Sequence, residues 1–268
     1  MLRAAPPRHS GRRSLFQPLA GAALWFGMAC SGMAQAPVQE SAPPAMGAEQ
    51  IAARIQQRNE QRAAALQSYE SVRVMTLSYK GTLTDKQATE TVQMTYTAPS
   101  SKQFVILSAM GSPLLRDSVF QRAMDSEQQA ATRGDTNITP ANYDMTLLGR
   151  ERLPEGDCYL LSVVPRHNNH FTFRGKIWVQ STEFAVVRVE AQPVETPSFW
   201  VKSGEFRVNY SKVGDFWFPA RMVSSSHIRL GGDATLTIQY GPYRILSAKP
   251  VKAPAPPPAS VTQQALEQ

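Results

Sequence analysis

The chain has 268 residues, of which 42% are hydrophobic and 18% are charged, an ordinary composition for a folded protein that excludes a disordered chain. Its 28 Lys and Arg against 21 Asp and Glu give a formal net charge of +7. Four of the arginines lie in the first 36 residues, which hold no acidic residue, and the rest of the chain has 24 basic against 21 acidic residues. A charge this close to neutral does not predict a nucleic-acid partner.

Residues 1–36 predict a cleaved export signal. A basic start precedes an apolar stretch over 15–33 and an Ala-Gln-Ala cleavage motif at 34–36. A membrane-spanning helix is the alternative, but Gln17, Pro18 and several Gly and Ser residues interrupt the stretch. We therefore expect an exported, periplasmic protein.

The same segment bears on the export route and on the number of cysteines in the mature chain. Arg12 and Arg13 fit a twin-arginine signal loosely, and Cys30 ends a degenerate lipid-attachment motif that lacks the usual aliphatic residue. This departure argues against a lipid anchor at Cys30. Cleavage after Ala36 leaves Cys158 as the only thiol, so no internal disulfide is expected.

A linker over 37–46 leads to a folded body over 47–247, which we expect to be one domain, and residues 248–268 are expected to form a proline-rich flexible tail. The first helix is predicted over 47–68, because apolar residues such as Ile51 and Ile55 recur on one face.

Beyond the first helix the hydrophobic period changes to two, which predicts strands over 72–79, 92–97 and 102–110. Ser112 and Pro113 then begin a second helix that ends near Ala131. Seven further strands, joined by short turns, are expected over 143–152, 158–165, 175–180, 185–192, 199–211, 216–228 and 234–244. Short turns imply antiparallel pairing. The predicted class is α+β, a strongly curved antiparallel sheet of about ten strands that forms an open half-barrel around two helices.

This order of elements resembles the LolA/LolB/RseB/LppX-like superfamily of bacterial envelope proteins over residues 50–246. A narrower resemblance, to proteins labelled outer-membrane lipoprotein-sorting protein, is most specific on the strands around Trp178 and Arg188. Its segments are 142–144, 147–149, 158–161, 173–179, 184–188 and 197–200. The resemblance implies a half-barrel with a helical lid that binds acyl chains in its hollow. The superfamily includes lipoprotein carriers, glycolipid carriers and an anti-sigma regulator, so the cargo stays open.

A lipid carrier needs a concave apolar surface with few polar groups. The candidate lining residues are large apolar ones on the strands and the second helix: Phe104, Ile106, Leu107, Leu115, Val119, Phe120, Met124, Trp178, Phe206 and Tyr210. Packing in an ordinary core is the alternative for each of them.

Arg188 lies between two valines on a predicted strand, which is unusual for a sheet interior. The resemblance implies an inward arginine that links a strand to the lid, so Arg188 is the candidate for contact with the lid or with a cargo head group. A salt bridge with Glu190 is the alternative.

Enzyme motifs are lacking. The sequence contains no G-x-S-x-G, H-E-x-x-H, Walker or G-x-G-x-x-G pattern, and His167 and His170 fall at a predicted turn. We expect no catalytic residue, no metal and no cofactor.

We expect a periplasmic carrier whose partners are lipid or lipoprotein acyl chains, with an envelope membrane protein as a further candidate partner. The alternatives are an envelope sensor or regulator of the same fold and an envelope hydrolase. The sequence leaves the oligomeric state unknown.

Overall fold

The computed structural model describes residues 46–196, 201–229 and 231–251, all within the compact unit Pro43–Gln268, which is distinct from a first unit, Met1–Ala42. The predicted export signal lies outside the described residues, as do nearly all of the predicted linker and tail.

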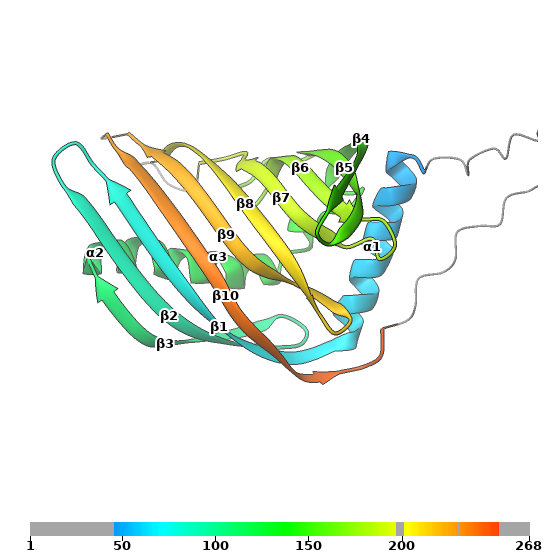
Figure 1. Cartoon of the computed structure of the whole chain (residues 1–268), viewed down its shortest axis with the longest axis horizontal. Helices are drawn as coiled ribbons and strands as arrows, with labels where there is room; N and C mark the ends of the chain where they lie inside the picture. The colour runs from blue at the N-terminus through cyan, green and yellow to red at the C-terminus, as the bar shows by residue number, and fades with distance from the viewer. Residues whose placement is uncertain (1–45, 197–200, 230, 252–268) are drawn as a thin grey trace, which may run out of the picture. The chain divides into compact units, whose positions relative to one another are not determined.

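Ten antiparallel strands form one sheet in the order β3-β2-β1-β10-β9-β8-β7-β6-β5-β4. β3 and β4 do not pair with each other, so this part of the chain holds an open sheet and not a closed barrel. The sheet coils most strongly toward β4–β7 (Figure 1). The predicted fold class, a curved antiparallel sheet of about ten strands with helices, is therefore confirmed. The strands are β1 Leu66–Lys80, β2 Asp85–Thr97, β3 Ser101–Gly111, β4 Tyr143–Leu153, β5 Gly156–Pro165, β6 Phe173–Gln180, β7 Val186–Pro193, β8 Val201–Val213, β9 Phe216–Ile228 and β10 Asp233–Ala248.

The first helix, α1, covers Ala48–Ala65 and passes directly into β1, three residues before the predicted end. The helix ends there because Leu66 adopts an extended backbone and pairs with Ala248 of β10. The N–H of Lys249 donates to the carbonyl oxygen of Ala65 at 2.8 Å. The C-terminal strand therefore fixes the point at which the first helix stops.

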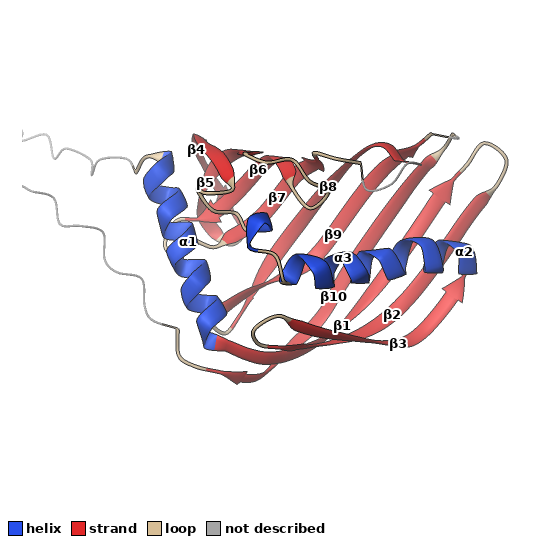
Figure 2. Ribbon diagram, turned by 180° about the vertical axis from the view of Figure 1, so that it is seen from behind, coloured by secondary structure: helices blue, strands red, loops and turns tan. Residues whose placement is uncertain are grey.

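The second helical segment begins at Pro113 and ends at Ala131, as predicted, but it is not one regular helix. A short turn, α2 (Pro113–Leu115), is followed by a π-helical turn (Arg116–Phe120) and by α3 (Gln121–Ala131). Together with α1, this segment lies on one face of the sheet (Figure 2). Because β3 and β4 are the two edges of the sheet, the segment between them crosses that face from one edge toward the other.

The core lies between the helices and this face. Ile51 and Ile55 of α1 are fully buried against inward side chains of β4–β7, such as Leu161 and Val179. Burying each isoleucine contributes about 2 kcal/mol. A second cluster packs under the Pro113–Ala131 segment, and a third, aromatic cluster contains Tyr69, with Phe218 and Tyr243 stacked at 4.4 Å between ring centroids.

Candidate functional site

Residues 113–131, here called the lid, bury apolar side chains against the sheet. Leu115, Val119 and Phe120 pack on Met75 and Ile238, which belong to β1 and β10. Phe120 is fully buried, and Met124, one turn further along, is nearly so. Four of the predicted lining residues therefore come from one element and point to the same face of the sheet.

The lid joins the sheet at Gly111, the last residue of β3. Gly111 has φ +81°, and a Cβ there would lie 2.2 Å from the carbonyl oxygen of Gln87. That oxygen also accepts a hydrogen bond from the N–H of Ser112 at 2.9 Å. Only glycine fits this close approach with a left-handed backbone, so the start of the lid is fixed by one residue.

Farther along, the lid is held by an ion-pair network, here called the latch, of Arg73, Glu127 and Lys102. Arg73 Nη1 lies 2.6 Å from Glu127 Oε2, and Lys102 Nζ lies 2.8 Å from Glu127 Oε1. The Arg73 side chain is only 1% exposed, and its guanidinium lies over the rings of Phe104 and Tyr240, 5.3 and 5.2 Å from their centroids. A cation in the middle of an apolar face is thus paired with an acid of the lid.

The latch sets the charge state of its own members. Burial alone would raise the pKa of Glu127, but hydrogen bonds and charge from Arg73 and Lys102 outweigh burial and lower the pKa below its usual value. In the same way, burial opposes the charge on Arg73, and the carboxylate of Glu127 more than compensates, which raises the pKa of Arg73. Glu127 and Arg73 are therefore both charged at neutral pH.

Beside the lid, the edge strand β3 exposes large apolar side chains. A β-bulge at Leu107 interrupts its pairing with β2, since Ile106 is opposite Val92 and Ser108 opposite Thr91. We call the exposed set, with the first leucine of the lid, the apolar edge. It consists of Val105, Ile106, Leu107, Met110 and Leu114, which are 51–66% exposed. Contiguous apolar patches on a soluble protein usually mark a binding surface.

The remaining predicted lining residues lie elsewhere. Phe104 faces inward against Arg73, whereas Phe206 and Tyr210 of β8 pack against the cluster under α1. Burial raises the pKa of Tyr210 to about 12, in keeping with a position deep on the inner face. The inward-facing residues of the predicted set thus form two groups, one at the lid and the other beneath α1.

Trp178 points to the opposite face of the sheet. Its neighbours Ile177 and Val179 pack with α1, and alternate residues of a strand point to opposite faces. Trp178 packs with Leu153 and Val187 in a separate cluster. The expectation that all ten candidates line one hollow is therefore corrected: Trp178 lies on the outer face, and Ile106 and Leu107 lie on the exposed edge.

Arg188 does not link a strand to the lid. It lies on the outer face, where its guanidinium stacks 5.4 Å from the centroid of Trp178. Glu190, the alternative partner, pairs instead with Arg207 at 2.9 Å. The inward arginine that contacts the lid is Arg73.

Arg73 and Glu127 are not among the predicted site residues, although both carry a signal in the sequence. Arg73 is in phase with Met75 and Leu77 on β1, and Glu127 is in phase with Met124 on the helix. An acid and a base that each fall on the apolar face of its own element predict a buried pair between the two elements.

Two observations on the described residues concern metal binding and thiol chemistry. They contain no group of three or more His, Cys, Asp or Glu side chains placed to hold a metal ion. Cys158 is buried, and burial raises the pKa of its thiol to about 11, which keeps it protonated and unreactive. Within the same residues, every helix is too short or too polar to span a membrane.

Comparisons with known proteins give structural likenesses only. No family model matches the chain, and no curated protein matches it by sequence. A DUF1329 family protein from Desulfovibrio piger is 14% identical, with a TM-score of 0.40, over 73% of this chain and 93% of that one. A LolA superfamily protein from Nitrosomonas europaea is 13% identical, with a TM-score of 0.34, over 75% and 94%. A domain from Vibrio parahaemolyticus, assigned to outer membrane lipoprotein sorting, is 11% identical, with a TM-score of 0.37, over 72% and 91%.

The last two names are those of the superfamily and of the narrower group that the sequence resembles. These TM-scores are below 0.5, and the fold is defined by the strand pairing of this chain itself.

Proposed function

We propose that this protein binds the acyl chains of a lipid or lipoprotein between the lid and the apolar edge, and carries them through the periplasm. The observation that supports the proposal is the apolar edge, which exposes large side chains to water on the strand next to a lid that already buries apolar residues. The protein is then a binding protein and not an enzyme.

An acyl chain suits this surface because it has no hydrogen-bonding groups to satisfy. Ile106 shares the lid-facing side of the sheet with Val92, whereas Val105 and Met110 lie opposite Gln93 and Thr89 on the other face. The apolar edge therefore meets the surface under the lid at Ile106. Each buried CH₂ contributes about 0.8 kcal/mol, and a chain that covers the edge and reaches under the lid gains several such increments. Covering the edge also removes an exposed strand that favours aggregation.

Entry under the lid requires the lid to move, and its attachments suit such a movement. Gly111 is the joint at one end, and the latch holds the other half through polar contacts. In the proposed cycle, an acyl chain replaces Leu115 and Val119 on the inner face when the lid lifts, and the latch closes again when the chain leaves.

The test is to purify residues 37–268 from the periplasm without detergent, record native mass spectra and identify extracted lipid. The test variant is Ile106→Ser/Leu107→Ser. The matched control is Leu148→Ser/Val164→Ser, which removes two side chains that are equally exposed, 50 and 51%, on the strands at the other end of the sheet. We expect bound lipid in the wild type and the control, and a loss of at least about tenfold in occupancy in the test variant.

An unliganded mass, together with no uptake of added fatty acid, would overturn the carrier proposal. Equal lipid content in the test variant and the control would also remove the apolar edge from the site.

A second function, that of an envelope regulator, is favoured by the free backbone of β3. β3 is an edge strand, and the N–H of Lys102 points away from β2, because it donates to Gln128 of the lid. Alternation along the strand then directs the N–H groups of Phe104 and Ile106 outward, where an added strand from a protein partner can pair. A photo-crosslinker at position 107 separates the two functions in the periplasm, since the adduct mass identifies a lipid or a protein.

A further inference from the structure

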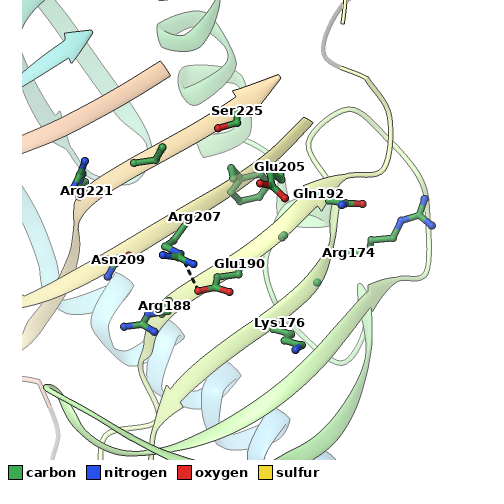
Figure 3. A pocket seen from close by; sticks show the side chains of 14 residues that line it. Arg174, Lys176, Arg188, Glu190, Gln192, Glu205, Arg207, Asn209, Arg221 and Ser225 are labelled. Carbon is green, nitrogen blue, oxygen red and sulfur yellow. Dashed lines mark ion pairs between the residues drawn. The ribbon is translucent and has the colours of Figure 1, made fainter. Parts of the chain in front are cut away.

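The face of the sheet opposite the helices carries a polar groove that the proposed carrier function does not use. It has a volume of about 970 Å³ and lies across β6–β9 (Figure 3). Arg188 of β7 is paired with Asn209 of β8, which is paired with Arg221 of β9, so three strands present polar side chains in one row. The charged and polar side chains that line the groove are Arg174, Lys176, Arg188, Glu190, Gln192, Glu205, Arg207, Asn209, Arg221 and Ser225.

The groove is strongly basic. Its lining contains five basic and two acidic side chains, an excess of three positive charges on a chain that is otherwise close to neutral. The ion pair between Arg207 and Glu190 is the only one formed between described residues of the lining. Within the described part of the chain, Arg174, Lys176 and Arg221 have no carboxylate partner. An excess of positive charge gathered in one groove favours an anionic ligand.

Arg188 is held in position for such a ligand. Glu151 Oε2 accepts a hydrogen bond from Trp178 Nε1 at 2.8 Å, and the ring of Trp178 lies under the Arg188 guanidinium. The Nε of Arg188 is buried and has no hydrogen-bond partner among the described residues. A guanidinium fixed by stacking loses little freedom when it binds an anion, and its planar fork of donors matches the oxygens of phosphate.

We propose that this groove binds a phosphate ester, with Arg188 and Arg221 as the principal contacts and Lys176 as an additional charge. A phosphate group offers several oxygens in a tetrahedral arrangement, which suits cations that converge from three strands. The source of the phosphate is either the head group of an anionic membrane lipid or a soluble phosphate ester. In both cases the ligand lies on the face opposite the lid and the apolar edge, so this site is separate from the acyl-chain site.

The experiment measures binding of residues 37–268 to two probes. The first is vesicles of phosphatidylglycerol, with phosphatidylcholine vesicles as the neutral comparison, and the second is soluble glycerophosphoglycerol. The test variant is Arg188→Gln/Arg221→Gln. The matched control is Lys80→Gln/Lys86→Gln, which removes the same charge from exposed residues in the β1–β2 hairpin. A further variant, Lys176→Gln/Arg221→Gln, changes only exposed side chains and serves if loss of Arg188 disturbs folding.

We expect the affinity of the test variant to be at least tenfold weaker, a loss of about 1.4 kcal/mol, and that of the control to change little. We also expect wild-type binding to weaken as salt is raised, because salt screens the attraction between the groove and an anion. Binding to both probes identifies the phosphate ester itself as the ligand, and binding to vesicles alone identifies the membrane surface as its source. Equal losses in the test variant and the control, or no binding to either probe, would overturn the proposal. The acyl content measured for the carrier proposal is expected to be unchanged in the test variant, so the two proposals fail independently.

Discussion

Arg73 on β1 and Glu127 on α3 form an ion pair, 2.6 Å between Nη1 and Oε2, across the face of the sheet that the helices cover. The apolar contacts of the lid are not directional and allow it to slide. The ion pair is directional, and it places one residue of the lid opposite one residue of the sheet. Lys102 adds a second contact from β3 to the same carboxylate. The ion pair thus sets the position of the lid on the sheet, and the burial of apolar side chains holds the lid there.

Replacement of Glu127 by alanine tests this role. The change leaves the buried guanidinium of Arg73 without its acceptor, and we expect the free energy of unfolding to fall by about 3 kcal/mol. Asp125→Ala, an exposed position on the same helix, is the control, with an expected loss below about 0.5 kcal/mol. Urea denaturation measures both. Similar losses in the two variants would show that the ion pair contributes no more than an exposed acid.

The pKa of Glu127 gives a prediction for pH. Because the folded state lowers this pKa below its usual value of 4.5, the ion pair stabilises the fold fully above that pH and is lost as pH falls through the folded pKa. The difference in unfolding free energy between the wild type and Glu127→Gln is therefore expected to be constant at neutral pH and to shrink in acid. A difference that grows on acidification would contradict the assignment.

Substitutions at Phe120 and Leu114 are expected to have separate effects, the first on stability and the second on binding. Phe120 is fully buried, so Phe120→Ala is expected to cost about 3–5 kcal/mol in unfolding free energy. Leu114 is 65% exposed, and Leu114→Ala is expected to cost less than about 0.5 kcal/mol while it weakens fatty-acid uptake. Thermal unfolding and a fluorescent fatty-acid titration give the two readouts. Unchanged uptake by Leu114→Ala would place this residue outside the site.

Gly111 is expected to resist substitution. An alanine there meets the carbonyl of Gln87 and must adopt a left-handed backbone, so Gly111→Ala is expected to lower the unfolding free energy by about 2 kcal/mol. Gly134 is the control, because a Cβ at that position has open space around it and its φ is not positive. Gly134→Ala is expected to be neutral or slightly stabilising. Equal effects at the two positions would mean that the joint of the lid tolerates a side chain.

The local periodicity of the sequence was sufficient to predict much of the fold. The change from a helical to a two-residue period after α1 predicted the strands, and the Ser112-Pro113 pair located the start of the lid. The strand order could not be predicted in this way, since the pairing of β1 with β10 joins opposite ends of the chain. The early end of α1 depends on that same long-range pairing.

The site was harder to predict because face assignment depends on distant contacts. Trp178 and Ile177 are both buried neighbours, and only the position of α1 decides which of them faces inward. Arg188 and Arg73 both lie between valines on strands, so their flanking residues do not distinguish them. The packing of Phe104 and Tyr240 around Arg73 does, and it involves strands that are remote in sequence.

The place of β10 in the sheet has a consequence for the order in which the protein is made. β1 and its hairpin partners leave the ribosome first, yet the side of β1 away from β2 is filled by the last strand of the sheet. Contacts between such distant segments carry a large loop-closure cost and slow the search for the native state. Until Asp233–Ala248 and Lys249 have been synthesised, β1 has an open edge and the carbonyl oxygen of Ala65 lacks its hydrogen bond from Lys249. The sheet is therefore completed only after its final strand has been made.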